Sequence, residues 1–171
     1  MQVNVAQLLK ETIGSTRSYE ISEFRDVADD GRVSLVQGNI TLTRTDRGIL
    51  ARGTLHTAVK IECSRCLSLY DCPLTVNIEE EFFPTIDIIS GTPLPLPEEP
   101  SAFPIDEQHI LDLSEAIRQN VILAIPMKQL CHEDCAGLCP KCGHNLNEGA
   151  CDCPSQEIDP RWAKLLKLIG Q

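Results

Sequence analysis

The stretch from Ile49 to Glu62, Ile-Leu-Ala-Arg-Gly-Thr-Leu-His-Thr-Ala-Val-Lys-Ile-Glu, decides the fold class, because its apolar side chains recur at every second position. The odd-numbered positions are mainly aliphatic, whereas the even-numbered ones include Arg52, His56 and Lys60. An antiparallel strand with one buried face and one face in water has this alternation. The strand runs directly into Cys63-Ser64-Arg65-Cys66, which places two cysteines at the tip of an expected β-hairpin.

The neighbouring segments extend this pattern into a sheet. Alternating or β-branched runs at 19–24, 33–45 and 74–82 predict further strands, and Asp46-Arg47-Gly48 predicts a hairpin turn. Residues 3–11 fit either a strand or a short helix. An apolar stripe predicts a helix over 113–124 that begins at a capping box of Asp112 and Glu115 and ends before Pro126. We therefore expect an α+β protein with an antiparallel β-sheet, a few short helices and a Cys-rich C-terminal segment.

Two parts of the chain differ in composition. Residues 1–126 hold the expected sheet and helix, with an acidic Pro-rich loop at 84–104 that contains six of the eleven prolines. Residues 127–171 hold the Cys-rich segment and a further helix that begins after Asp159-Pro160. Because Trp162, Leu165, Leu166 and Ile169 form an apolar stripe on a short helix, we expect this helix to dock on the protein or on a partner.

Composition favours a cytoplasmic protein. The longest aliphatic run covers only residues 121–125, far short of the roughly 20 residues that a membrane helix needs. Residues 1–10 have no apolar core of the kind found in signal peptides. With no export signal, we expect reduced cysteines, and hence metal ligands rather than disulfides. No contact with a membrane is expected.

The net charge of −10 lies entirely in one half of the chain. Residues 1–73 carry nine basic and nine acidic side chains, whereas residues 74–171 carry six and sixteen. Because proteins that bind nucleic acids present basic surfaces to the phosphates, the first half is the better candidate for RNA contact. The candidate RNA-binding side chains lie on or beside the expected hairpin: Arg44, Arg47, Arg52, Lys60 and Arg65. The same five residues also fit an ordinary solvated strand face and turn.

Six of the nine cysteines lie within residues 131–153. Cys139-Pro140-Lys141-Cys142-Gly143 has the form of a zinc knuckle, in which two thiolates three residues apart reach one metal ion from a tight turn. Cys151 and Cys153 follow eight residues later. Four thiolates complete a tetrahedron and leave no open position, so we predict a structural zinc site at Cys139, Cys142, Cys151 and Cys153.

The other cysteines suggest a second site, formed by Cys63, Cys66, Cys131 and Cys135, that ties the hairpin tip to the C-terminal segment. Several alternatives stay open. Cys135 fits the first site in place of Cys151 or Cys153, and His132 and His144 are reserve ligands. Buried free cysteines and an iron–sulfur cluster also fit the pattern. Cys72 is left over, and we expect it in the core or on the surface.

Catalytic motifs are missing from the sequence. It has no Gly-rich phosphate loop, no nucleophile elbow of the G-x-S-x-G type and no H-E-x-x-H helix, so no enzymatic activity and no small-molecule substrate are expected. Two functions of other classes remain as alternatives. One is a redox-responsive zinc-binding regulatory protein, in which exposed thiolates oxidise and release the metal. The other is an enzyme with a cysteine nucleophile.

An ordered set of motifs closely resembles a known family. The motifs are Cys63–Leu67, Leu123–Pro126, Gly137–Asn147, Cys151–Cys153 and Asp159–Arg161. In this order they resemble the YceD-like family of bacteria and plastids, the large ribosomal RNA subunit accumulation proteins, over nearly the whole chain. The resemblance implies a bacterial cytoplasmic ribosome-biogenesis factor that supports accumulation of large-subunit (23S) ribosomal RNA, with no enzymatic activity. A ribosomal protein and a precursor of large-subunit ribosomal RNA are both candidate partners, and the acidic charge favours the protein.

Overall fold

The computed structural model describes residues 1–28, 31–97 and 102–153 of the chain. In these residues seven strands form one sheet in the order β1-β7-β6-β5-β4-β3-β2, accompanied by two helices. In chain order the elements are β1 (Gln2–Asn4), α1 (Ala6–Lys10), β2 (Thr16–Arg25), β3 (Ser34–Arg44), β4 (Ile49–Glu62), β5 (Leu69–Pro84), β6 (Phe103–Ile105), β7 (Ile110–Asp112) and α2 (Ser114–Ala124).

The strand predicted from the 49–62 pattern is β4, and its alternation is the one expected. Ile49, Ala51, Leu55 and Val59 are buried, whereas Arg52, Thr54, His56 and Lys60 are exposed. Antiparallel pairing joins β4 to β5 from Ile49 opposite Phe82 to Glu62 opposite Leu69. The turn after this last pair carries Cys63 and Cys66, so the prediction that two cysteines lie at a hairpin tip is confirmed.

The sheet is mixed, so the prediction of a purely antiparallel sheet was wrong at one pairing. Strand β6 runs parallel to β5, with Phe82 opposite Phe103 and Pro84 opposite Ile105. Because β6 is parallel to β5, the connection between Pro84 and Phe103 must return along the length of the pairing before β6 begins. Phe82 and Phe103 stack with ring centroids 5.2 Å apart, which gives this short pairing an apolar anchor in the core.

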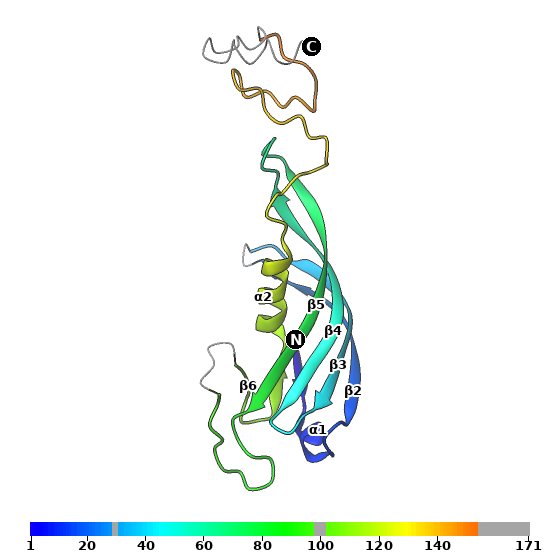
Figure 1. Ribbon diagram of the computed structural model, residues 1–171, viewed down its shortest axis with the longest axis vertical. Coiled ribbons are helices and arrows are strands. Elements are labelled where there is room, and N and C mark those ends of the chain that lie inside the picture. The colour runs from blue at the N-terminus through cyan, green and yellow to red at the C-terminus, as the bar shows by residue number, and fades with distance from the viewer. Residues whose placement is uncertain (29–30, 98–101, 154–171) are drawn as a thin grey trace, which may run out of the picture.

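Helix α2 covers one face of the curled sheet (Figure 1), where it packs against β5. Its buried residues are Ala116, Ile117 and Val121. The predicted end before Pro126 is confirmed, because α2 stops at Ala124 and the next residue is extended. The N-terminal residues, which fitted either a strand or a helix, form both in succession: β1 and α1.

The predicted capping box at the start of α2 was wrong. Asp112 belongs to β7, where it pairs with Gln2 of β1, and the helix begins at Ser114, one residue later than a cap at Asp112 requires. Its Oδ1 still accepts a hydrogen bond from the Ser114 amide at 2.8 Å. Glu115 does not reach back to the cap, because its carboxylate accepts hydrogen bonds from Arg118 and Gln119. Hydrogen bonding to Arg118 and Gln119 lowers the pKa of Glu115 to about 2.

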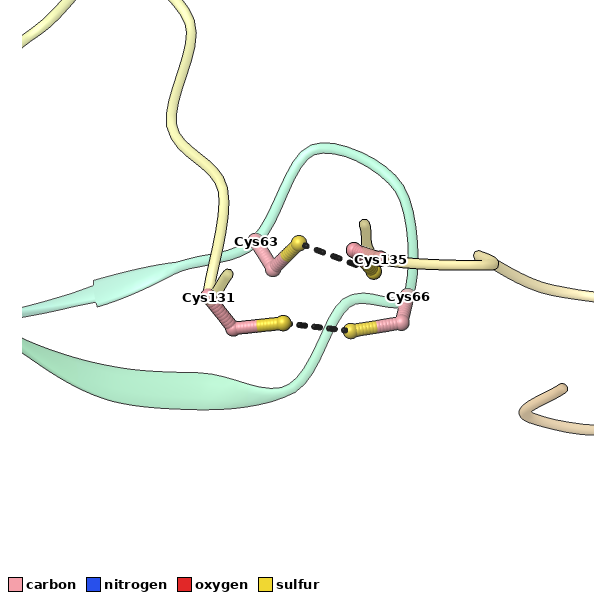
Figure 2. Close-up of side chains that lie close together, drawn as sticks. All are labelled: Cys63, Cys66, Cys131 and Cys135. Atoms are coloured by element: carbon pink, nitrogen blue, oxygen red, sulfur yellow. Dashed lines mark hydrogen bonds between the residues drawn. The ribbon is translucent and has the colours of Figure 1, made fainter. Parts of the chain in front are cut away.

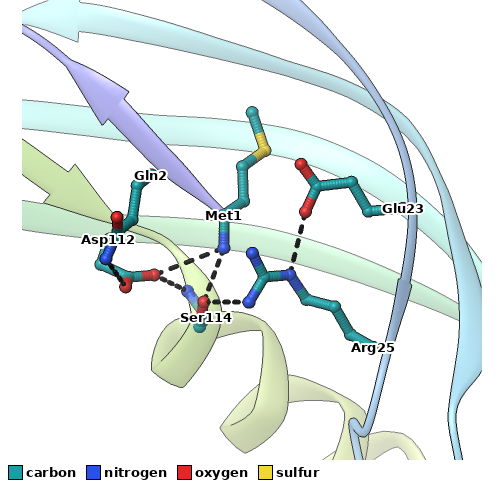
Figure 3. Close-up of polar contacts among 6 residues, drawn as sticks. All are labelled: Met1, Gln2, Glu23, Arg25, Asp112 and Ser114. Carbon is teal, nitrogen blue, oxygen red and sulfur yellow. Dashed lines mark hydrogen bonds and ion pairs between the residues drawn. The ribbon is translucent and has the colours of Figure 1, made fainter.

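Polar contacts around Asp112 tie β1, β2 and α2 together (Figure 3). The Met1 amino group donates to Ser114 Oγ at 2.6 Å, Arg25 Nη1 donates to the same oxygen at 2.7 Å, and Gln2 Nε2 donates to Asp112 Oδ2 at 2.9 Å. Partial burial opposes the ionisation of Asp112, but hydrogen bonds from Ser114 and Gln2 hold its pKa well below the usual range.

Asp112→Asn is therefore expected to lower the free energy of unfolding at pH 7 by about 1 kcal/mol, since the carboxylate is 44% exposed and its interactions are screened. A lowered pKa in the folded state stabilises the protein above the unfolded pKa of roughly 4, and that stabilisation is lost as the pH falls below it. Urea unfolding at pH 7 and pH 3 checks this, with Asp46→Asn at the exposed β3–β4 turn as control. A difference from wild type that stays the same at both pH values would contradict the account.

Two sequence-based expectations concern the rest of the chain. The expected helix after Asp159-Pro160 lies outside the described residues. The Pro-rich segment is mostly irregular where it is described, with one isolated bridge between Ile86 and Pro93, although Pro104 lies within β6. Among the described helices, none has the length and apolar character needed to cross a bilayer.

Candidate metal centre

The segment that follows α2 returns to the tip of the β4–β5 hairpin. Ser64 donates from both its amide and its Oγ to the Gln129 carbonyl, at 2.9 Å and 2.8 Å. Arg65 Nη1 donates to the Cys135 carbonyl at 2.8 Å. These bonds hold residues 129–135 against the hairpin turn, and the segment after α2 runs up to the tip of the β4–β5 hairpin (Figure 1). Cysteines about 70 residues apart in sequence therefore meet at one place.

Four sulfurs gather there, and we call them the hairpin cluster: Cys63, Cys66, Cys131 and Cys135. Figure 2 shows the first two on the hairpin turn and the other two on the returning segment. Cys63 Sγ lies 3.8 Å from Cys135 Sγ, Cys66 Sγ lies 3.7 Å from Cys131 Sγ, and all four sulfurs are within 4.8 Å of one another. Cys63, Cys66 and Cys135 are at most 5% exposed and Cys131 is half-buried, so most of the cluster is shielded from water.

These distances match the dimensions of a tetrahedral thiolate site. A Zn–S bond of about 2.3 Å places the sulfurs at tetrahedral corners about 3.8 Å apart. A disulfide would need the sulfurs about 2.05 Å apart, and all nine cysteines are free. The hairpin cluster is therefore preformed for one ion with four thiolate ligands.

The second group of four is the C-terminal cluster: Cys139, Cys142, Cys151 and Cys153. Its sulfurs also lie within 4.8 Å of one another. It is more open than the hairpin cluster, because Cys139 is buried, Cys142 is exposed and the other two are half-buried. The structure thus brings together the same two sets of four that the sequence spacing suggested.

The two cysteine turns repeat one backbone design. In the hairpin, Leu67 N donates to Cys63 O at 2.9 Å and Cys63 N donates to Ser68 O at 3.0 Å. In the knuckle, Gly143 N donates to Cys139 O at 2.9 Å and Cys139 N donates to His144 O at 2.8 Å. The residue after the second cysteine has a positive φ in both turns, +59° at Leu67 and +74° at Gly143. A leucine rarely adopts this conformation, so the hairpin turn holds it against its local preference.

The two turns also favour the thiolate form of their first cysteine. At Cys63, burial opposes ionisation, but the amides of Cys66 and Arg65 lower the pKa to about 6. At Cys139, the amides of Cys142 and Lys141 lower the pKa to about 6. A thiolate is the form of cysteine that binds metals, so the amides of each turn stabilise one cysteine in its metal-binding form.

In each cluster, the pKa of one other thiol is shifted in the opposite direction. Burial and the neighbouring thiols raise the pKa of Cys131 to about 12. Hydrogen bonding to Cys142 and burial raise the pKa of Cys153 to about 12. Four thiolates at these distances repel one another, and a divalent cation removes that repulsion.

The remaining predicted ligands lie outside both clusters. His132 Nδ1 lies 3.1 Å from Cys131 Sγ, and His144 contributes its backbone carbonyl to the knuckle turn. Neither imidazole belongs to a group of four among the described residues. Cys72, which the sequence left without a role, is buried on β5 in the main hydrophobic core.

The five candidate RNA-binding side chains are all engaged within the chain. Arg52 pairs with Glu79, Arg47 pairs with Glu81 at 2.9 Å, and Lys60 lies 3.9 Å from Asp71. Arg44 donates to the carbonyls of Thr45 and Gly48 at the β3–β4 turn, and Arg65 donates to the Cys135 carbonyl. The hairpin therefore presents alternating charges rather than a continuous basic face.

One contact at the hairpin cluster comes from a residue that spacing does not nominate. Asn147 lies in the loop between the two halves of the C-terminal cluster, and its Nδ2 donates a hydrogen bond to Cys135 Sγ over a distance of 3.4 Å. Nothing in the sequence points to this contact, because a hydrogen bond from an amide to sulfur has no characteristic spacing.

Comparison with known proteins identifies relatives but no structural template. An uncharacterized protein of Mycobacterium tuberculosis is 33% identical over 138 residues, which are 80% of this chain and 63% of the relative. An uncharacterized protein of Mycobacterium leprae is 30% identical over 125 residues, or 71% of this chain and 54% of the relative. The chain thus spans less than two thirds of these proteins. No solved structure matches it.

A plant relative carries a descriptive name. The Arabidopsis thaliana protein called large ribosomal RNA subunit accumulation protein YCED homolog 1, chloroplastic, is 27% identical over 169 residues, which are 86% of this chain and 52% of the relative. The family model described as "Large ribosomal RNA subunit accumulation protein YceD" matches residues 51–169, from β4 through both cysteine clusters. The resemblance seen in the motifs is confirmed, and the chain belongs to the YceD family.

Proposed function

We propose that the chain is a non-catalytic, zinc-binding ribosome-biogenesis factor that supports accumulation of large-subunit ribosomal RNA. The observation that carries this proposal is the family match over residues 51–169, whose description names that role. The name of the plant relative uses the same words. Both cysteine clusters lie inside the matched region.

The donor sets fit structural zinc. Each cluster offers four thiolates, which fill the tetrahedron that zinc prefers and leave no position for a substrate or a reactive water. The spacing of the sulfurs suits one ion at the centre of four corners, whereas a cluster of several irons would hold its thiolates around a larger body. Bound zinc supplies a cross-link between the β4–β5 hairpin and the segment after α2, where few apolar side chains are buried.

A basic protein is the partner that we propose, rather than bare RNA. The net charge of −10, all of it contributed by residues 74–171, opposes binding to phosphates. Arg52, Arg47 and Lys60 already face the carboxylates of Glu79, Glu81 and Asp71, so their charges are offset within the chain. Ribosomal proteins with basic surfaces have the charge that complements this chain.

The double substitution Arg52→Ala, Lys60→Ala is expected to leave the affinity for large-subunit ribosomal RNA fragments within about twofold, because both cations are already paired. Filter binding at graded salt checks this. The matched variant Glu79→Gln, Asp71→Asn frees the same two cations and is expected to strengthen RNA binding. Tight, salt-dependent binding by the wild-type chain that disappears in the alanine variant would show that RNA is the direct partner.

A depletion experiment tests the function itself. Removing the gene from its host is expected to lower the ratio of large-subunit to small-subunit ribosomal RNA, and the wild-type chain should restore it. A Cys63→Ser, Cys135→Ser variant should fail to restore it, whereas Cys72→Ser, which changes a cysteine outside both clusters, should succeed. An unchanged ratio after removal would contradict the proposed function.

The redox-responsive alternative is favoured by one observation: Cys142 is exposed in the C-terminal cluster, whereas the hairpin cluster is mostly buried. Exposed thiolates are the ones that oxidants reach first. Under this alternative, dilute hydrogen peroxide releases zinc from the C-terminal cluster before the hairpin cluster, and a thiol reductant with added zinc reverses the loss. Zinc that stays bound under mild peroxide argues for a purely structural role.

A further inference from the structure

The loop between Cys142 and Cys151 folds back onto the other cluster. Asn147 Nδ2 donates to Cys135 Sγ at 3.4 Å, and Asn145 Nδ2 donates to Ser68 Oγ at 3.4 Å, next to the hairpin turn. Leu138, which lies between Cys135 and Cys139, packs against the buried hairpin cluster. A loop whose two ends belong to the C-terminal cluster therefore contacts a ligand of the hairpin cluster.

The orientation of the Asn147 amide is fixed by its surroundings. The Ala136 amide donates to Asn147 Oδ1 at 2.8 Å, and a backbone N–H can only donate, so the oxygen faces Ala136. The NH₂ group then faces Cys135 Sγ and also donates to Asn145 Oδ1 at 2.8 Å. Asn145 Oδ1 also accepts a hydrogen bond from the backbone N–H of Asn147, at 3.1 Å, which completes a compact turn.

We propose, on the basis of the zinc binding proposed above, that Asn147 is a positioning residue that holds the Cys135 thiolate in the hairpin cluster. An N–H group aimed at a metal-bound thiolate withdraws charge from the sulfur and fixes its direction, as other groups that contact metal ligands do. Because the C-terminal cluster anchors both ends of the loop, Asn147 couples metal retention at the hairpin cluster to folding of the C-terminal cluster.

The substitution Asn147→Asp removes the NH₂ donor, with its bonds to Cys135 Sγ and Asn145 Oδ1, and keeps the loop contact with the Ala136 amide. An aspartate keeps an oxygen for the Ala136 amide but replaces the NH₂ group with an oxygen that repels the thiolate. The similarly sized Asn147→Leu removes all three side-chain contacts, to Ala136, Cys135 and Asn145. Asn39→Asp makes the same chemical change on the exposed face of β3, far from either cluster, and controls for net charge.

The experiment measures zinc release from the full-length chain into a chromophoric chelator. Wild type is expected to release its two zinc ions slowly, and Asn39→Asp should match it. In Asn147→Asp and Asn147→Leu, the ion in the hairpin cluster should leave about tenfold faster. In the cadmium-113-substituted protein, the NMR resonance that Cys135→Ser abolishes should shift in Asn147→Asp.

Each outcome has one meaning. If Asn147→Asp releases zinc at the wild-type rate and the cadmium resonance stays in place, the positioning role is overturned. It is also overturned if only Asn147→Leu accelerates release, because the Ala136 contact alone would then explain the effect. Wild-type protein with less than half an equivalent of zinc would overturn the underlying zinc proposal, a failure that is visible before any variant is made.

Discussion

Cys135→Ser is expected to lower the zinc content from two ions to one per chain and to free the segment after α2 from the hairpin tip. Cys135 Sγ lies 3.8 Å from Cys63 Sγ in a buried cluster, and a serine hydroxyl is a poor replacement for a thiolate ligand of zinc. Elemental analysis and native mass spectrometry measure the stoichiometry. Cys72→Ser, a buried cysteine outside both clusters, should retain two ions.

Hydrogen exchange shows which part of the fold depends on this site. In Cys135→Ser, amides of residues 126–135 and of the hairpin turn should lose protection, because metal binding and local folding are linked. Strands β3 and β4 have their own aliphatic core around Ile40, Leu42 and Leu55, so their protection should persist below the tip. An equal loss of protection throughout 33–62 would show that the metal site and the sheet fold as one unit.

Gly53→Ala is expected to destabilise the sheet by about 3 kcal/mol, a large effect for a single methyl group. Gly53 on β4 faces Ile40 on β3, and a Cβ there would fall inside contact distance of the Asn39 carbonyl oxygen and against the backbone of Ile40. Both obstacles are backbone atoms of a paired strand, so the two strands must separate locally.

Thermal unfolding checks this prediction, and a loss of about 10 °C in Tm is expected for a chain of this size. Asn39→Ala places a new alanine on the neighbouring strand, one position from the residue opposite Gly53 and on the exposed face, and should change Tm by less than about 2 °C. A Gly53→Ala protein as stable as Asn39→Ala would mean that β3 and β4 approach less closely than the structure shows.

Local periodicity was sufficient to predict the long strands. The alternation in 49–62 arises because one face of β4 is buried, and burial at every second residue is a property of a single strand. The three-residue strand β6 has no such signal, since it is short and contains Pro104. Its parallel pairing with β5 depends on where a long loop returns, which no local pattern encodes.

The start of α2 shows how sheet pairing can override a capping signal. Asp112 and Glu115 have the spacing of a capping box, but Asp112 is held in β7 by its pairing with Gln2. Leu113 is buried at the junction, so the chain turns inward before the helix begins. The Asp112 carboxylate still accepts a hydrogen bond from the Ser114 amide at the start of the helix. In a capping box, the donor would be the amide of Glu115, one residue further along the chain.

The two cysteine clusters were predictable for a different reason. The knuckle turns are local structures, so Cys63–Cys66 and Cys139–Cys142 stand out by spacing alone. The meeting of Cys131 and Cys135 with the hairpin required one further inference, that the segment after α2 returns to the tip of β4–β5. The contact of Asn147 with Cys135 depends on the folded loop, so it could be found only in the structure.

Zinc-edge X-ray absorption spectroscopy of the chain purified without added metal tests the central claim most directly, because it reports the metal, its amount and its ligands together. We predict two zinc ions per chain, each surrounded by four sulfurs at about 2.3 Å, with no nitrogen or oxygen in the shell. Iron in place of zinc, a shell that includes imidazole nitrogen, or less than half an equivalent of zinc would contradict two all-cysteine zinc sites.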